Sequence, residues 1–423
     1  MRASWHSVGL CAALTVLGCQ PANIDVLTNF EAPSLPQHTT TKFLHWGAGQ
    51  PAGEAELRWL VEHLSDVEAT PFDGMVLDLG VATSLFTVDL TEASFSASAD
   101  LIRTAPFHSF TDNFQKLDLA PLDLSDDAAW DRMAQNLTLI ARVVRDAGLR
   151  GFMLDTQQYV AYPWSYARLP AGKGTFAQES ARAFARGQQL LRAMLVSYPD
   201  VTVLETLGTS EVFREVCIEG NTLEQSDYAM LPAFLDGMRA AGDEARSGAS
   251  LLDAFLPAYA TRLPASFRLY HDMIHGDWGA MQAHWLAGVA TYRWATLEDD
   301  QTLGESRWPD VSALLCSEAE RRLLTRDVTA SFSIMLDYRN AALGTDVFQI
   351  DPARFGENTH TPAAYTELLR SALQSSDRYV WSWSSSVLWW PKPGDNRAVI
   401  PPEYLDAARL ARKQASGLAD VSP

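Results

Sequence analysis

The stretch Gly151-Phe152-Met153-Leu154-Asp155-Thr156-Gln157 decides the fold, because it is a short apolar run that ends in an acid and lies between two long helical patterns. The helical patterns cover residues 125–147 and 175–198. Ser125-Asp126-Asp127 places a cap and negative charge where the first helix begins, and free N–H groups favour both there. Gly148 suits a left-handed cap at its end. A strand between two helices predicts parallel pairing with right-handed crossovers.

The same alternation of strand and helix recurs along the chain. We expect strands at residues 42–47, 72–80, 113–119, 151–155, 201–208, 251–259, 332–338 and 379–384. We expect helices at residues 54–66, 125–147, 175–198, 225–241, 310–326, 361–376 and 401–416. Eight such units predict an α/β fold of the (β/α)8 TIM-barrel type, with a doubly wound parallel sheet as the alternative.

Two linkers in this pattern are long, at residues 81–112 after the second strand and 260–309 after the sixth. In a parallel barrel, the loops that follow strands emerge on one face, which carries the chemistry. We therefore expect both linkers to form walls over a cleft.

The N-terminus carries an export signal. Arg2 precedes an apolar run at residues 8–17, which is shorter than the roughly 20 residues that span a bilayer and has the length of a signal-peptide core. The run ends in Val16-Leu17-Gly18-Cys19, which resembles the lipobox of bacterial lipoproteins. That resemblance implies cleavage after residue 18 and a lipid on Cys19. Ordinary secretion with cleavage elsewhere is the alternative.

These signals divide the chain into a signal peptide at 1–18, a flexible Pro- and Thr-containing tether at 19–41 and a barrel domain at 42–418. Gln20 follows the lipidated position and no Asp retention signal is present, which in lipoproteins implies the outer membrane. We expect a protein of the cell envelope, anchored by lipid and facing the periplasm or the cell surface.

Composition limits the class of partner. The apolar fraction of 47% suffices for a large buried core, and the net charge of −19 argues against nucleic acid and anionic lipid surfaces. Outside the N-terminal segment only Cys217 and Cys316 remain. They are either a disulfide, as an oxidising compartment allows, or two buried thiols.

Acidic residues recur where the predicted strands end. These residues are Asp78, Asp118, Asp155, Glu205 and Asp337, with Asp253 earlier on its strand. Any one of them can be a cap for the next helix. Their recurrence at one mouth suits cleavage of a glycosidic bond, which needs one carboxyl group to donate a proton and a second to attack or to activate water.

The quoted strand also resembles the fourth-strand motif of chitinase-like barrel glycosidases, Gly-aliphatic-Asp-aliphatic-Asp-aromatic-Glu. Asp155 matches the second Asp, whereas Met153 replaces the first and Gln157 replaces the Glu that donates the proton in that family. An amide has no proton of this kind to give, so Gln157 is not the general acid. The resemblance implies either a different acid or a site that binds without cleaving.

For an active enzyme, we expect Asp155 to be the base or nucleophile and Asp337 or Glu205 to be the proton donor. Asp337 ends an Ile334-Met335-Leu336 run that mirrors the strand before Asp155. The sequence thus predicts a lipid-anchored glycoside hydrolase-like protein that acts on a polysaccharide or oligosaccharide and needs no cofactor. A non-catalytic glycan-binding lipoprotein is the first alternative.

Aromatic residues gather at the same predicted mouth. With Gln157, we expect substrate contacts from Trp46, Tyr159, Trp164, Tyr259, Trp381, Trp383 and Trp389. Alternation along the strand places Trp381 and Trp383 on one face. Sugar rings stack on such side chains, although Trp also packs under outer helices.

His271-Asp272-Met273-Ile274-His275 resembles the His-Glu-x-x-His zinc motif, with Asp in place of Glu and no third ligand at the expected spacing. A solvated helix face is the favoured explanation of the pair, because histidines four residues apart are common by chance, so no metal is assigned to the site. A metal-dependent hydrolase that uses these two histidines is the second alternative function.

Overall fold

The computed structural model describes residues 41–119, 123–158, 162–170, 173–262, 264, 266–276, 316–325, 329–337, 350–392 and 394–417. The chain divides into two compact units, Met1–Ser34 and Leu35–Pro423. The first unit, and with it the predicted signal peptide and Cys19, lies outside the described residues. Among the described residues, no helix has the length and apolar character that crossing a bilayer requires.

Nine strands form one parallel sheet in the order β7-β6-β5-β4-β3-β2-β1-β9-β8. Their bounds are Lys42–Gly47 (β1), Gly74–Leu77 (β2), Phe114–Asp118 (β3), Gly151–Asp155 (β4), Thr202–Glu205 (β5), Ser250–Asp253 (β6), Thr329–Ala330 (β7), Phe332–Met335 (β8) and Tyr379–Ser384 (β9). The predicted strands at 42–47, 151–155 and 379–384 are confirmed to the residue.

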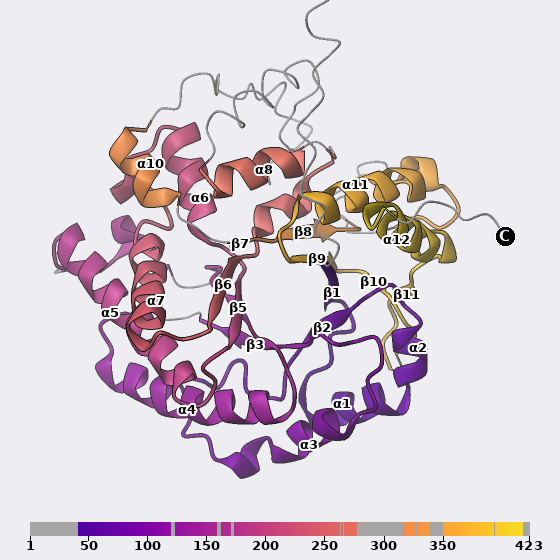
Figure 1. Cartoon of the computed structure of the whole chain (residues 1–423), viewed down its shortest axis with the longest axis horizontal. Coiled ribbons are helices and arrows are strands. Elements are labelled where there is room, and N and C mark those ends of the chain that lie inside the picture. Colours follow the sequence, from indigo (N-terminus) through magenta and orange to yellow (C-terminus); the bar gives the residue numbers. More distant parts are fainter. Residues whose placement is uncertain are drawn as a thin grey trace, which may run out of the picture. The chain divides into compact units, whose positions relative to one another are not determined.

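The sheet closes because β7 and β8 are two halves of one stretch of chain, separated only by Ser331. β7 pairs with β6 and β8 pairs with β9, both in parallel. The N–H of Ser331 donates to the carbonyl of Asp253 at 2.9 Å, which continues the pairing across the break. The strands therefore occupy eight positions around a closed ring (Figure 1). This confirms the predicted (β/α)8 barrel and excludes the alternative, a doubly wound sheet.

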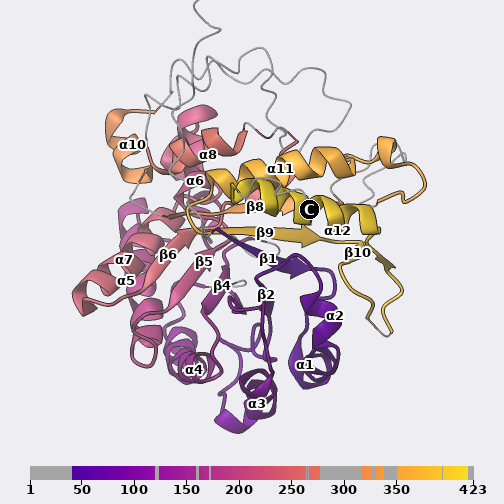
Figure 2. The ribbon, with the colours of Figure 1, turned by 45° about the vertical axis from the view of Figure 1, so that its right-hand side comes forward.

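Helices surround the ring of strands (Figure 1). Their bounds are Gly53–Glu62 (α1), Leu64–Glu68 (α2), Ser96–Thr104 (α3), Asp127–Asp146 (α4), Phe176–Leu195 (α5), Thr209–Phe213 (α6), Leu231–Ala245 (α7), Ser266–Ile274 (α8), Glu318–Leu324 (α10), Pro362–Ser375 (α11) and Pro402–Ala415 (α12). Helices α11 and α12 pack on each other beside β8 and β9, as Figure 2 shows.

Several helix ends carry the predicted caps. The side chain of Asp126 accepts from the N–H of Ala129 at the start of α4, and Gly148 has a φ of +77° just after its end. Thr175 forms a capping box with Gln178 at the start of α5. These local signals fix where the long helices begin and end.

Each of the two long linkers contains a helix of the barrel that the sequence pattern did not predict, and residues 277–309 of the second linker lie outside the described residues. Helix α3 lies within 81–112, and α8 lies within 260–309. Both have only nine residues, and no side chain caps the start of α3, which explains why the sequence pattern missed them. The predicted sixth strand is also too long: β6 ends at Asp253, and a 3₁₀ turn, η6 (Leu256–Ala260), follows.

Cys217 and Cys316 form a disulfide, with Cα atoms 4.4 Å apart. Cys217 lies in a π-helical turn, η4 (Arg214–Ile218), and Cys316 precedes α10. The disulfide thus joins the loop region after β5 to the chain that leads into β7. Of the two alternatives for these cysteines, a disulfide or two buried thiols, the structure shows the first.

Helices α5 and α7 approach each other through a pair of glycines. A Cβ on Gly187 would lie 1.9 Å from the carbonyl oxygen of Phe234, and a Cβ on Gly237 would lie 1.9 Å from that of Phe184. Both clashes are with backbone atoms, so a side chain at either position forces the helices apart. This contact holds the layer of helices outside β4, β5 and β6.

We predict that Gly237→Ala lowers the free energy of unfolding by about 1–3 kcal/mol or more, because the added methyl overpacks a backbone contact. Gly242→Ala, on the same helix, is the matched control: its Cβ would meet only side-chain atoms, at 3.6 Å. Helix propensity alone then favours Ala by up to about 1 kcal/mol. Urea unfolding of both variants checks this, and equal effects at the two positions would contradict it.

Candidate functional site

The interior of the barrel is filled by alternate residues of the strands. This inner cluster comprises Leu44, Trp46, Val76, Phe114, Met153, Leu204, Leu252, Ala254, Tyr379 and Trp381. The residues between them belong to the larger core under the helices. Because side chains alternate along a strand, this division shows which strand-end residues face the interior.

Asp118 and Asp155 end β3 and β4 and both face the interior. Phe114 and Met153 belong to the inner cluster, and the two acids lie at even spacing from them. Asp118 and Asp155 are also directly paired in the register of the two strands. The structure therefore places two carboxyl groups side by side at the C-terminal mouth of the barrel.

A lysine accompanies this pair. Nζ of Lys116 lies 2.9 Å from Oδ1 of Asp118 and 3.2 Å from Oδ2, and the two side chains are 24% and 19% exposed. Asp155 is 4% exposed, and its Oδ1 accepts hydrogen bonds from the N–H of Gln157 at 3.1 Å and from Oγ1 of Thr206 at 3.4 Å. Lys116 compensates the charge of Asp118, which stays partly exposed.

Three tryptophans face the interior near the same mouth. The ring of Trp46 lies 5.0 Å from that of Trp381 and 5.1 Å from that of Trp383, centroid to centroid. Trp381 is fully buried and donates from Nε1 to the carbonyl of Ala254, whereas Trp383 is only partly buried. The predicted shared face of Trp381 and Trp383 is confirmed, and Trp383 is the one of these three rings that is partly exposed.

Of the remaining predicted aromatic contacts, Trp164 and Trp389 lie away from the barrel interior. Trp164 packs on Phe234 of α7, and Trp389 packs on Phe72, so both belong to the outer core. Tyr259 lies in η6, six residues beyond the end of β6, and is half-buried. Tyr159 lies outside the described residues. These side chains follow strand ends, where the alternation of the strand no longer sets their direction.

Glu205 does not join Asp155 at the mouth. Its neighbour Leu204 belongs to the inner cluster, so Glu205 faces outward, towards Arg239 of α7. It is fully buried, and neither carboxylate oxygen has a hydrogen-bond partner among the described residues. Burial raises the pKa of Glu205 to about 8, attraction to Arg239 opposes this, and repulsion from Asp253 adds to it.

Asp253 faces outward in the same way, because Leu252 and Ala254 on either side belong to the inner cluster. Its carboxylate accepts from the N–H and the hydroxyl of Ser210 at the start of α6 and from the N–H of Phe255. Asp253 therefore fixes the turn that leads from β5 into α6, which is a structural role.

Asp337 and Asp78 are engaged with the loops next to them. Asp337 is buried and accepts from the N–H groups of Ser385 and Ser386 and from the Ser386 hydroxyl. Burial raises the pKa of Asp337, while these hydrogen bonds act against the rise. Oδ1 of Asp78 accepts from three successive N–H groups, those of Gly80, Val81 and Ala82. Both acids thus hold the turns that follow β9 and β2.

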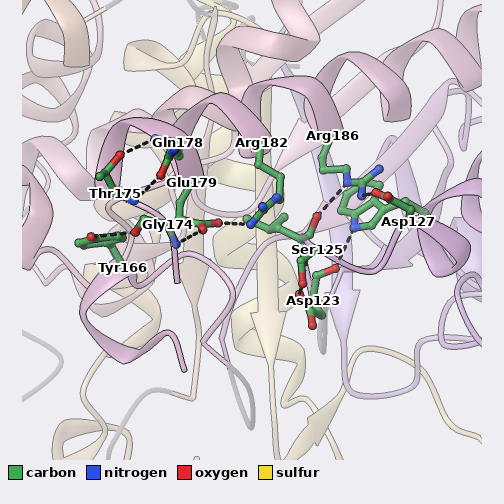
Figure 3. Close-up of polar contacts among 12 residues, drawn as sticks. Asp123, Ser125, Asp127, Tyr166, Gly174, Thr175, Gln178, Glu179, Arg182 and Arg186 are labelled. Atoms are coloured by element: carbon green, nitrogen blue, oxygen red, sulfur yellow. Dashed lines mark hydrogen bonds and ion pairs between the residues drawn. The ribbon is translucent and has the colours of Figure 1, made fainter. Parts of the chain in front are cut away.

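A polar network braces the loops beside the mouth after β3 and β4 (Figure 3). Arg186 of α5 donates to the carbonyl of Leu124 at 3.0 Å and binds the carboxylate of Asp127, and its guanidinium lies over the ring of Trp130. On the same helix, Glu179 binds Arg182 and accepts from the N–H of Gly174 at 2.8 Å. The network ties the chain that follows β3, at Leu124 and Asp127, to α5, and it holds the chain at the start of α5.

Sequence reasoning included Asp118 among the strand-end acids but missed Lys116 and the pairing with Asp155. The alternation of Phe114, Lys116 and Asp118 on one face was the available signal. It shows that the three share a face but does not say that this face is the interior.

Comparisons with known proteins add little. No family model matches the sequence, and no curated protein matches it. A solved structure described as XacCel5A in complex with cellopentaose matches with a TM-score of 0.40 and 10% identity, over 88% of this chain and 100% of that chain. A similarity of this size carries no information about activity.

We predict that Glu205→Gln removes a pH dependence of stability. The carboxyl group of Glu205 releases its proton near pH 4.5 in the unfolded chain and near pH 8 in the folded chain. The free energy of unfolding of wild type therefore falls as the pH rises through that window. The variant is expected to match wild type at pH 4.5 and to exceed it at pH 8.5 by a few kcal/mol, at about 1.4 kcal/mol per pKa unit. Urea unfolding at both pH values measures this. Glu224→Gln, at an exposed position, is the control. The prediction would be contradicted if the free energy of unfolding varied with pH in the same way in wild type and in Glu205→Gln.

Proposed function

We propose that the mouth of the barrel binds a carbohydrate chain and hydrolyses a glycosidic bond, with Asp118 and Asp155 as the carboxyl pair. The observation that carries this proposal is the register pairing of two inward-facing acids at the mouth of a barrel that also carries a partly exposed, inward-facing tryptophan on β9. Register partners on neighbouring strands lie about 4.8 Å apart, close to the roughly 5–5.5 Å between the carboxyl groups of retaining glycosidases. The pair Asp118–Asp155 thus replaces the expected pair of Asp155 with Asp337 or Glu205.

The surroundings of the two acids suggest their roles. Asp118 has its charge compensated by Lys116 and is the more exposed of the two, so it suits the attack on the anomeric carbon. Asp155 lies deeper, beside Thr206 and Gln157, and suits the exchange of a proton with the leaving oxygen and then with water. A sugar ring stacked on Trp383 would hold the bond over this pair.

The proposal predicts that wild-type protein releases reducing ends from one member of a polysaccharide panel. Asp118→Asn and Asp155→Asn are expected to lower kcat at least a hundredfold, since each removes a group that acts in the transition state. Activated dinitrophenyl glycosides separate the roles, because their leaving group needs no proton. Asp155→Asn should still release dinitrophenol in a first-turnover burst, because only the later attack of water needs its base, whereas Asp118→Asn should show no burst.

Asp337→Asn is the informative control. We expect it to lower Tm, because the carboxylate holds the Ser385–Ser386 turn, and to leave kcat of the folded protein nearly unchanged. Loss of turnover in Asp337→Asn at unchanged Tm, with Asp118→Asn fully active, would instead support the Asp155–Asp337 pair and contradict the assignment made here.

Binding without cleavage is the second candidate function. Gln157 stands where the resembling glycosidases carry their acid, and this amide can bind a sugar hydroxyl without protonating a leaving group. Glycan binding that is lost in Trp383→Ala, with no turnover by wild type, would favour this function over hydrolysis.

We also infer that the protein is tethered to the outer membrane through lipid on Cys19, facing the periplasm or the cell surface. The lipobox-like Val16-Leu17-Gly18-Cys19 supports this location. The Cys217–Cys316 disulfide is compatible with it, because disulfides persist in oxidising compartments such as the periplasm.

In a bacterial host supplied with an alkyne-labelled fatty acid, we predict that the full chain takes up label and sediments with membranes. Cys19→Ser should abolish both, because it removes the thiol that carries the lipid. Cys11→Ser, inside the same apolar run, is the matched control and should behave as wild type. Labelling that survives Cys19→Ser would refute lipidation at this residue.

A further inference from the structure

Two histidines and an aspartate meet at the N-terminal end of the barrel, away from the mouth. His271 and His275 lie one turn apart at the end of α8, and Asp377 lies between α11 and the start of β9. Helix α8 follows β6 and leads the chain back, so its last turn lies where strands begin. The hydrogen bond from the N–H of Asp377 to the carbonyl of Ala330 in β7 places the aspartate at that end as well.

The three side chains converge through the atoms that bind metals. Nε2 of His271 lies 3.2 Å from Oδ1 of Asp377, and Nε2 of His275 lies 2.7 Å from Oδ2. One ligand atom from each residue lies within 4.8 Å of the other two. Ligand atoms around a tetrahedral Zn²⁺ are about 3.4 Å apart, given bonds of about 2.0–2.1 Å, so an ion requires only small movements of these side chains.

The groups behind the ligands are those that a metal site needs. Nδ1 of His271, on the far side of its ring, lies 3.5 Å from Oδ1 of the buried Asp272, which in turn lies 3.2 Å from Arg268. A carboxylate near the second nitrogen is common behind metal-binding histidines, and here it stands at an ion-pair distance without a hydrogen bond to Nδ1. Asp377 is held by its hydrogen bond from the N–H of Ala330 at 2.7 Å.

The setting also favours a cation that arrives from solvent. The side chains of His271, His275 and Asp377 are 20%, 28% and 18% exposed. His271 lies in the last turn of α8 and His275 directly follows the helix, where unpaired carbonyl groups favour positive charge.

We propose that His271, His275 and Asp377 bind one divalent ion of the zinc class, with water completing the coordination. Two imidazole nitrogens select zinc and its neighbours over magnesium and calcium, which prefer oxygen ligands. The ion would join the end of α8 to the starts of β7 and β9, where the barrel closes. The site is structural, because residues at this end of a (β/α)8 barrel serve stability and the chemistry lies at the other end. The zinc motif thus does not support a metal-dependent hydrolase at the mouth.

The test uses full-length protein without a polyhistidine tag, stripped with chelator and titrated with ZnCl2 by calorimetry, with metal content measured by mass spectrometry. We expect one equivalent of Zn²⁺ and a rise in Tm. His271→Ala and His275→Ala should each weaken Zn²⁺ binding at least tenfold. His108→Ala, which removes an exposed imidazole elsewhere, should not change it.

Asp377→Asn provides a variant that keeps an acceptor for the N–H of Ala330 and loses the charged ligand. It should fold, as circular dichroism without metal will show, and bind Zn²⁺ at least tenfold more weakly. Absence of binding to wild type at 100-fold molar excess of ZnCl2 would overturn the proposal. Unchanged affinity in the His271 and His275 variants would overturn it as well, because the ion would then bind elsewhere.

Discussion

Each strand of the closed ring has one face towards the barrel interior and one towards the helices, and this alternation decides what every strand-end residue can do. Asp118 and Asp155 face the interior at the mouth. Glu205 and Asp253 are also paired in register, but they face the helices. A shift of one residue along the strand therefore separates carboxyl groups at the mouth of the barrel, of which Asp118 is partly exposed, from a fully buried pair behind the barrel wall.

Much of the fold follows from the sequence because its strands and long helices are marked locally. The strand at 379–384 and the long helices on either side of 151–155 show this, since caps and apolar periodicity lie within the segments themselves. The faces of the strands are harder to assign. Strands of a parallel barrel are buried on both sides, so Val203 and Leu204 give no sign of which one faces the interior. That ambiguity is why Glu205 was expected at the mouth.

Residues beyond strand ends are harder still, because turns and not the pleat direct their side chains. Asp337 lies two residues beyond β8 and binds the loop after β9. Contacts between distant segments leave no local signal at all. Asp377 lies more than 100 residues from both His271 and His275, and only the closure of the ring brings them together. The sequence could identify the histidine pair but not its third partner.

The cross-link between η4 and the chain before α10 spans 99 residues, a segment that includes β6 and α8. In the chain-entropy model, closing a loop of about 100 residues costs the unfolded chain about 4.7 kcal/mol of conformational freedom. A chain that folds before the disulfide forms lacks this stabilisation of its folded state. The part of the barrel affected is the one that contains β6 and α8. Maturation of that segment therefore depends on the thiol chemistry of the compartment in which folding is completed.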